Sequence, residues 1–140
     1  MTDNFIDQVK AEVSSTIGID FDGVLHANSK GYHDGTIYGE LIPGSTEALQ
    51  FLSTKYKLII YTCKAAPERP LVDGKTGTEL IEEWLEKHQI DQYISGITNK
   101  KPRALFYIDD KVIRFTNNWA IVIDEVNKLE KEFANDISKF

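Results

Sequence analysis

Residues 16–25, Thr-Ile-Gly-Ile-Asp-Phe-Asp-Gly-Val-Leu, decide the fold of this 140-residue chain. The stretch begins with β-branched and small residues, which favour a buried strand. Two carboxylates, Asp20 and Asp22, and then Gly23 follow at once, as is typical where a buried strand emerges into a loop. We therefore predict a first strand that brings two acids to one edge of a sheet.

Four more short apolar segments predict the rest of the sheet, at residues 57–62, 93–97, 104–108 and 120–123. Helical patterns lie between and around them, at 3–14, from 43 to about 55, at 78–88 and at 125–140. Short strands that alternate with helices indicate an α/β domain with a mostly parallel sheet. The predicted sheet has five strands.

Composition narrows the class of protein. Apolar residues make up 41% and charged residues 27% of the chain, and the length fits one domain spanning residues 1–140. The net charge of −6 opposes non-specific binding to nucleic acid or anionic lipid. The lone Cys63 excludes an intramolecular disulfide and a cysteine-based zinc cage. No signal-peptide pattern and no apolar run of membrane-spanning length is present, so we expect a cytoplasmic protein with no membrane partner.

Acidic, hydroxyl and cationic side chains gather where the predicted strands end. Because the carboxyl ends of parallel strands meet at one edge of a sheet, we expect these side chains to lie close together. Four carboxylates at one edge would repel one another without a cation, and carboxylate oxygens are ligands that Mg²⁺ prefers. The sequence therefore predicts a magnesium site. The residues concerned are Asp20, Asp22, Thr62, Lys100, Lys101, Asp109 and Asp110.

The motifs IGIDFDGV, LIIYT, a lysine and LFYIDD, in this order, resemble those of the haloacid dehalogenase-like (HAD) phosphohydrolase superfamily. The resemblance spans about residues 16–123. It implies a three-layer, Rossmann-like, HAD-like domain and a Mg²⁺-dependent phosphatase that hydrolyses a phosphate monoester. Acids that cap helices or lie in solvated turns would explain any one motif alone. The ordered set favours the resemblance.

The resemblance gives four residues catalytic roles. Asp20 matches the nucleophile that forms an aspartyl-phosphate, and Asp22 matches the general acid and base. Thr62 matches a hydroxyl that donates to a phosphoryl oxygen. Lys101 matches the cation that neutralises the nucleophile and the phosphoryl group, with Lys100 as its rival.

The resemblance also implies metal ligands and substrate contacts. Asp110 is expected to bind Mg²⁺ more directly than Asp109, which binds it or is oriented through water or Lys101. The metal set is Asp20, Asp22 through its carbonyl oxygen, Asp109 and Asp110. The substrate-binding set is Gly23, Thr62, Cys63, Lys101 and His33. A lone cysteine is nevertheless expected to be buried and inert, and a histidine on a flap to be solvated.

The spacing of the motifs leaves no room for a large cap domain. About 20 residues separate Gly23 from Pro43, which suffices for a flap at about 24–42. An open site suits an extended substrate, such as a nucleotide or a polynucleotide end. One alternative is a small sugar-phosphate phosphatase closed by its flap or by oligomerisation. Another is a non-enzymatic phosphoaccepting or interaction domain, although a receiver domain would carry an aspartate after residues 93–97.

Side chains outside the motifs are assigned to the core or to solvent. Trp84 and Trp119 are expected in the core. The terminal helices are expected to pack on the sheet through the pairs Phe5/Val9 and Leu129/Phe133. His26, on the flap, is expected to be solvated.

Overall fold

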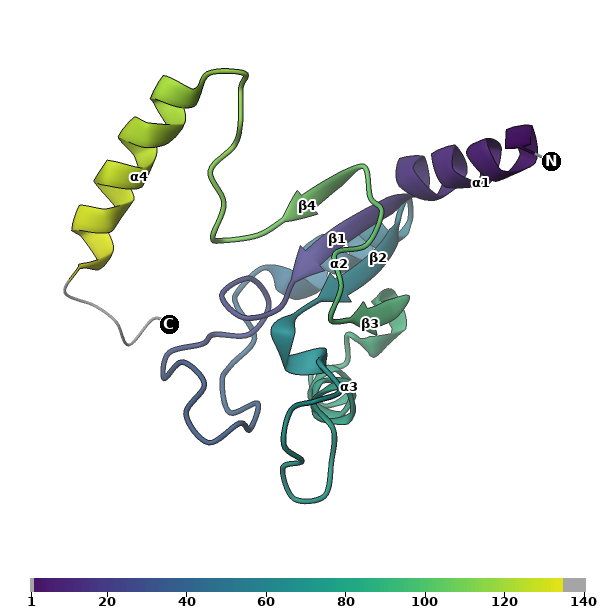
Figure 1. The fold of residues 1–140 in the computed structure, drawn as a ribbon. Coiled ribbons are helices and arrows are strands. Elements are labelled where there is room, and N and C mark those ends of the chain that lie inside the picture. The colour runs from purple at the N-terminus through teal and green to yellow at the C-terminus, as the bar shows by residue number, and fades with distance from the viewer. Residues whose placement is uncertain (1, 135–140) are drawn as a thin grey trace.

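The sheet has four parallel strands, and the computed structural model, which describes residues 2–134, places them at the centre of an α/β fold (Figure 1). The strands are β1 (Thr16–Asp20), β2 (Lys57–Tyr61), β3 (Gly96–Thr98) and β4 (Phe106–Ile108), in the order β3-β2-β1-β4. Asp20 pairs in register with Tyr61, and Ile19 with Ile108. The carboxyl ends of β1, β2 and β4 therefore share one edge.

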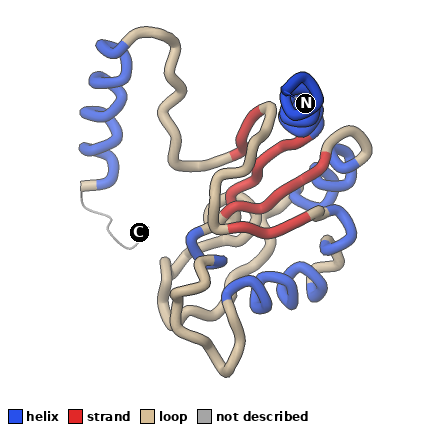
Figure 2. Tube along the Cα trace, turned by 45° about the vertical axis from the view of Figure 1, so that its right-hand side comes forward, coloured by secondary structure: helices blue, strands red, loops and turns tan. Residues whose placement is uncertain are grey.

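The helices differ in how they meet the sheet. Helices α2 (Ser45–Ser53) and α3 (Gly77–Lys87) pack against it, and α3 begins with a capping box between Thr76 and Glu79. Helix α1 (Thr2–Ser15) leads directly into β1, and α4 (Trp119–Phe133) lies apart from the sheet (Figure 2). Two short 3₁₀ turns, η1 (Cys63–Ala65) and η2 (Asp91–Tyr93), complete the elements. No helix in the described part of the chain is long and apolar enough to cross a membrane.

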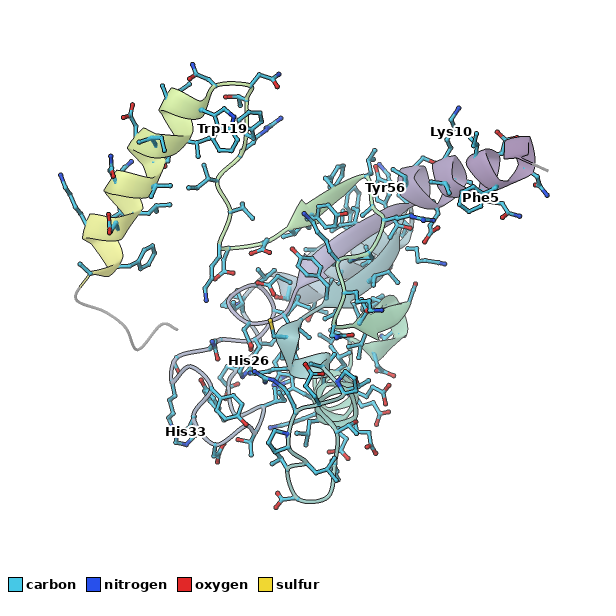
Figure 3. All side chains as sticks on the ribbon, in the orientation of Figure 1. Phe5, Lys10, His26, His33, Tyr56 and Trp119 are labelled. Carbon is cyan, nitrogen blue, oxygen red and sulfur yellow. The ribbon has the colours of Figure 1, made fainter. Side chains whose placement is uncertain are left out.

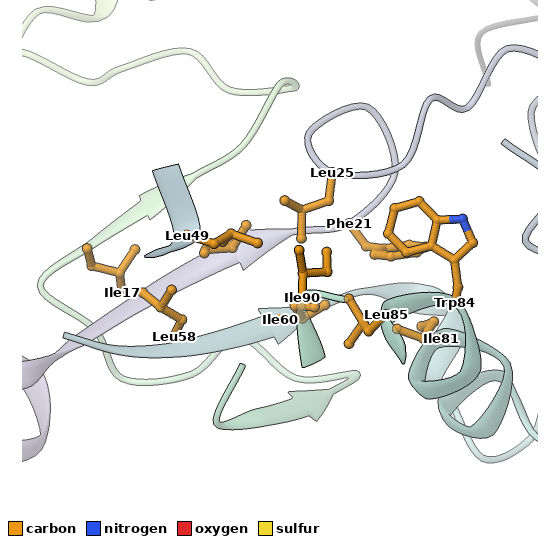
Figure 4. Packing of buried hydrophobic residues seen from close by; sticks show 11 residues of the cluster. Ile17, Phe21, Leu25, Leu49, Leu58, Ile60, Ile81, Trp84, Leu85 and Ile90 are labelled. Atoms are coloured by element: carbon orange, nitrogen blue, oxygen red, sulfur yellow. The ribbon is translucent and has the colours of Figure 1, made fainter. Parts of the chain in front are cut away.

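The core lies between one face of the sheet and helices α2 and α3 (Figure 4). Alternate residues of β1 and β2 point to this face because side chains alternate along a strand. Trp84 of α3 is buried and packs against Phe21, in the loop that follows β1. This confirms the prediction that Trp84 is a core residue. The buried apolar residues are Ile17, Ile19, Phe21, Leu25, Leu49, Leu58, Ile60, Ile81, Trp84, Leu85 and Ile90.

The opposite face carries tyrosines and a crossing segment of chain. A Cβ on Gly18 would lie 2.6 Å from Cδ1 of Tyr107, so this position of β1 has room only for glycine. The Tyr107 hydroxyl donates to the carbonyl of Pro102 at 2.6 Å, which fixes residues 99–105 across this face. The helices that bury apolar side chains on the sheet therefore lie on one face, and the predicted three-layer arrangement is not confirmed.

The prediction of a fifth strand at 120–123 is wrong, because these residues form the first turns of α4. The side chain of Asn118 accepts hydrogen bonds from the backbone N–H groups of Ala120 and Ile121, at 3.0 and 3.3 Å. This cap begins a helix at a segment whose apolar residues continue at helical spacing. Those residues are Val122, Val126, Leu129 and Phe133.

Other boundaries move by a few residues. The predicted strand at 93–97 begins only at Gly96, since residues 91–93 form η2. The predicted strand at 104–108 shortens to 106–108. The last helix starts at Trp119 rather than residue 125, and residues 135–140 of its predicted extent lie outside the described residues.

The prediction that both terminal helices pack on the sheet is also wrong. The side chain of Phe5 on α1 is 59% exposed, and Trp119, which opens α4, is 70% exposed. Trp119 contacts the ring of Phe115 instead of entering the core. Val9, Leu129 and Phe133 are half-buried, but the described residues of α1 and α4 contribute no side chain to the core.

Candidate active site

Three of the predicted carboxylates meet at the carboxyl edge of the sheet. Asp20 ends β1, and Asp109 and Asp110 directly follow β4. One carboxylate oxygen from each of the three lies within 4.8 Å of the other two. We call these residues the acid cluster. Asp20 and Asp109 are partly buried and Asp110 is exposed, so the cluster opens to solvent on one side.

Neighbouring groups orient the acid cluster. The backbone N–H of Phe21 donates to Oδ1 of Asp20 at 2.9 Å. The hydroxyl of Tyr61 donates to Oδ2 of Asp109 at 2.6 Å, and the backbone N–H of Lys111 donates to Oδ1 of Asp109 at 2.9 Å. Burial, and then the hydrogen bond to Asp109, raise the pKa of Tyr61, so the phenol stays a donor. Asp109 is therefore held through both of its oxygens.

Gly23 makes room for Asp110. Its φ of +85° lies in the region that favours glycine. A Cβ on Gly23 would overlap Oδ2 of Asp110. The glycine that follows the first two acids is thus required both for the turn and for the close approach of the third.

Repulsion inside the acid cluster changes the protonation of Asp20. Burial, a hydrogen bond to Asp110 and the charge of Asp109 raise the pKa of Asp20 to about 7. An oxygen-ligated divalent cation placed among the three carboxylates would remove this repulsion. The donor set and its spacing therefore fit the predicted metal site.

The raised pKa of Asp20 predicts how stability varies with pH in the metal-free protein. The pKa of an unperturbed aspartate is 3.8, and the pKa of Asp20 in the folded chain is about 7. Between these values the unfolded chain loses its Asp20 proton while the folded chain keeps it, so the free energy of unfolding falls as pH rises. In EDTA, the melting temperature should therefore drop between about pH 4 and about pH 7. The variant Asp20→Asn should show a smaller drop, and an equal drop would contradict this account.

Asp22 lies in a second group beside the acid cluster. Its Oδ1 accepts hydrogen bonds from Nδ1 of His26 and from Nζ of Lys64, both at 2.8 Å. Burial favours the neutral acid, but these two hydrogen bonds outweigh it and hold the pKa of Asp22 below its usual value. Asp22 is thus ionised in the resting protein.

Lys64 and His26 are site residues that the sequence pattern did not reveal. Lys64 is only 5% exposed although it is a lysine, and its ammonium group pairs with Asp22. His26 is fully buried, so the prediction of a solvated histidine is wrong. The only sequence signal for Lys64 is its place two residues after Thr62, among small residues. A buried lysine needs such a partner, which only the fold supplies.

Thr62 is buried at the end of β2, next to the edge where Asp20 lies. Its Oγ1 accepts from the backbone N–H of Lys64 at 3.2 Å and caps η1, which leaves the hydroxyl hydrogen to be donated. Cys63 begins η1 and is exposed, so the prediction that it is buried is wrong. Both residues border the loop that carries Lys64.

Lys101 and Lys100 lie on the segment that crosses the open face of the sheet. The ammonium group of Lys101 lies 4.2 Å from the centre of the Tyr107 ring, a cation–π contact, rather than against a carboxylate. The backbone N–H of Lys100 donates to Oγ1 of Thr98 at 3.1 Å. The structure therefore does not bring Lys101 into contact with the acid cluster.

His33 lies on the flap, in the loop that follows β1 (Figure 3). Its side chain is 47% exposed, and its ring contacts Tyr38 of the same flap. The structure does not place it near Asp20. Its substrate contact stays a prediction.

The candidate site thus consists of the acid cluster and, beside it, Asp22 with its two donors. Comparisons of the chain with protein-family models, curated proteins and solved structures found no match. Any function must therefore be inferred from the chemistry of these residues.

Proposed function

We propose that the chain is a Mg²⁺-dependent, HAD-like phosphatase that hydrolyses phosphate monoesters through an aspartyl-phosphate on Asp20. The main support is one geometric observation: three carboxylates from β1 and β4 lie within 4.8 Å of one another, beside an aspartate held by its own donors. The order of these residues along the chain is that of the resemblance described above. A cytoplasmic location remains part of the proposal.

The acid cluster would hold the cation through Asp20, Asp109 and Asp110, together with the carbonyl oxygen of Asp22. When bound, a divalent cation offsets the negative charge of the carboxylates and of a phosphoryl group. Asp20 would then be ionised at neutral pH, as a nucleophile must be. This accounts for a pKa that lies near 7 in the metal-free chain.

The chemistry proceeds in two steps. A carboxylate oxygen of Asp20 attacks phosphorus, the bond from phosphorus to the leaving oxygen breaks, and Asp22 gives that oxygen a proton. Water then attacks phosphorus, gives its proton to Asp22 and releases inorganic phosphate and the Asp20 carboxylate. Asp22 acquires the first proton as substrate binds, because the negative phosphoryl group raises the pKa of a neighbouring acid.

Lys64 and Thr62 complete the proposed site. Lys64 already contacts an aspartate of the site, whereas Lys101 would first have to leave the Tyr107 ring. We therefore favour Lys64 as the cation beside Asp22, with Lys101 reaching the phosphoryl group only after a movement of residues 99–105. The Thr62 hydroxyl is available to donate to a phosphoryl oxygen.

The proposed function is tested by assaying a panel of phosphomonoesters with Mg²⁺ and with EDTA. Turnover should need Mg²⁺, and Mg²⁺ should raise the melting temperature, because a ligand that binds only the folded state stabilises it. The double variant Asp109→Asn/Asp110→Asn should lose both effects. A matched control is Asp73→Asn/Asp124→Asn, which removes two exposed charges away from the site. Equal Mg²⁺ shifts in the site variant and the parent would refute the metal site.

The open edge of the site predicts a preference for long substrates. Asp110 is exposed, and residues 24–42 form a flap that contains no helix or strand. Remote contacts with an extended substrate can position its phosphate, whereas a small molecule has few such contacts here. A 3′- or 5′-phosphorylated oligonucleotide should therefore show a higher kcat/KM than p-nitrophenyl phosphate at one salt concentration. Preference for a small sugar phosphate would instead indicate closure by the flap or by oligomerisation.

A further inference from the structure

His26, in the loop that follows β1, is enclosed by aromatic rings. It is fully buried, and its ring stacks on Phe21 with the centroids 5.3 Å apart. The rings of Trp84 and Tyr38 meet it edge-on, at 5.6 and 5.1 Å. The backbone of the loop is closed by a hydrogen bond from the N–H of Gly23 to the carbonyl of His26, at 2.9 Å. The imidazole therefore has one orientation.

The hydrogen bonds of His26 fix its tautomer. The backbone N–H of Gly39 donates to Nε2 at 2.8 Å. A backbone N–H can only donate, so Nε2 carries a lone pair and the proton lies on Nδ1. The neutral ring then donates from Nδ1 to Oδ1 of Asp22 at 2.8 Å. The direction of the bond to Asp22 is thus set by a peptide group of the flap.

Both donors to Asp22 end on the same oxygen. Oδ1 receives the bond from His26 and the bond from Lys64, and these fix the plane of the carboxylate. Proton transfer then falls to Oδ2, to which neither of these two donors is bonded. An acid that must protonate a leaving oxygen and later accept a proton from water needs one such oriented oxygen.

The backbone of Gly39 links His26 to helix α3. Its carbonyl accepts from the indole N–H of Trp84 at 3.0 Å, while its N–H is bonded to His26. A Cβ at this position would overlap the carbonyl oxygen of Ala27 and lie 2.7 Å from Nε2 of His26. Only glycine lets the flap approach the imidazole this closely. The base of the flap is thereby tied to Asp22 through one histidine.

From this chain of contacts we infer that His26 is a positioning residue: it holds Asp22 so that Oδ2 meets the leaving oxygen, and it couples that geometry to the flap through Gly39. The inference rests on the proposed function. Since His26 acts through Asp22, its loss should matter most for substrates whose leaving group needs a proton. An alkyl phosphate needs one, whereas p-nitrophenyl phosphate has a leaving group that departs readily without it.

The test compares two variants on two substrates. His26→Phe keeps an aromatic ring but removes both hydrogen bonds, and His26→Asn returns a donor toward Asp22. With His26→Phe, kcat for an alkyl phosphate should fall by about 10²-fold, and that for p-nitrophenyl phosphate by less than about 10-fold, with KM little changed. His26→Asn should recover most of the loss. His88→Gln is the control for a half-buried histidine outside the site, and it should leave both rates unchanged.

Equal losses on the two substrates, or no recovery with His26→Asn, would overturn the inference and leave His26 a purely structural residue. Retention of the Mg²⁺-induced rise in melting temperature shows that a variant keeps the acid cluster. Should His26→Phe fail to fold, imidazole ¹H–¹⁵N correlation spectra of the parent decide: a proton on Nδ1 of His26 supports the inference, and a proton on Nε2 contradicts it. If the parent has no phosphatase activity, the proposed function itself is refuted. If the parent is active and Asp22→Asn loses more activity on alkyl phosphates than on p-nitrophenyl phosphate, but the His26 variants show no such difference, only this inference is refuted.

Discussion

Replacing Asp20 with asparagine should lower phosphatase turnover by at least about 10³-fold, since the loss of a nucleophile removes the covalent route. The amide has nearly the shape of the carboxylate and can still accept the Phe21 N–H at the Oδ1 position. It also removes one of three repelling charges from the acid cluster. The variant should therefore fold, with a melting temperature in EDTA at neutral pH at or above that of the parent.

The control for this substitution is Asp73→Asn. Asp73 is exposed and has a φ of +51°, a conformation that asparagine tolerates well. It makes the same chemical change outside the site and should leave kcat unchanged. An Asp20→Asn protein that turns over substrate at a rate near that of the parent would eliminate Asp20 as the nucleophile.

Replacing Asp22 with asparagine should lower kcat by about 10²- to 10⁴-fold, the range for loss of a general acid and base. The amide oxygen can still accept from His26 and Lys64, so the local structure should persist. The loss should be larger for alkyl phosphates than for p-nitrophenyl phosphate. Rates are compared for the two substrates at saturating Mg²⁺, and an equal loss on both would argue against a proton-transfer role.

The buried strands and the acid cluster were predictable from sequence for a simple physical reason. In the Thr16–Asp20 strand, apolar side chains at alternate positions point into the core, and the acids come where the strand leaves it. Parallel pairing then brings the carboxyl ends of β1 and β4 together, independently of the conformation of the loops. The meeting of Asp20 with Asp109 and Asp110 follows from topology alone.

The start of α4 was not predictable in the same way. Residues 119–123 are apolar and β-branched, so over this short span a buried strand and a helix give the same pattern. The side chain of Asn118 favours the helix, because it accepts hydrogen bonds from two N–H groups of the first turn. A cap of this kind is a small energetic effect that outweighs intrinsic strand preference only in its structural context.

His26 and Lys64 were missed because distant contacts bury them. His26 is enclosed by Trp84 of α3 and Gly39 of the flap, and neither pairing is visible in the order of residues. Lys64, rather than the predicted Lys101, is the cation that contacts an aspartate, because the ammonium group of Lys101 lies over the Tyr107 ring. Motif order identifies the acids of the site, whereas the partners of those acids depend on side-chain packing.

Trapping the phosphorylated intermediate would show whether Asp20 carries the phosphoryl group. The Asp22→Asn variant is mixed with p-nitrophenyl phosphate and Mg²⁺, quenched in acid within one turnover and digested for mass spectrometry. Loss of the general base slows the hydrolysis of the aspartyl-phosphate, so it should accumulate. We expect one added phosphoryl group on the peptide that contains Asp20, and none in the double variant Asp20→Asn/Asp22→Asn. A phosphoryl group on any other residue, or none in a protein that still releases p-nitrophenol, would contradict this expectation.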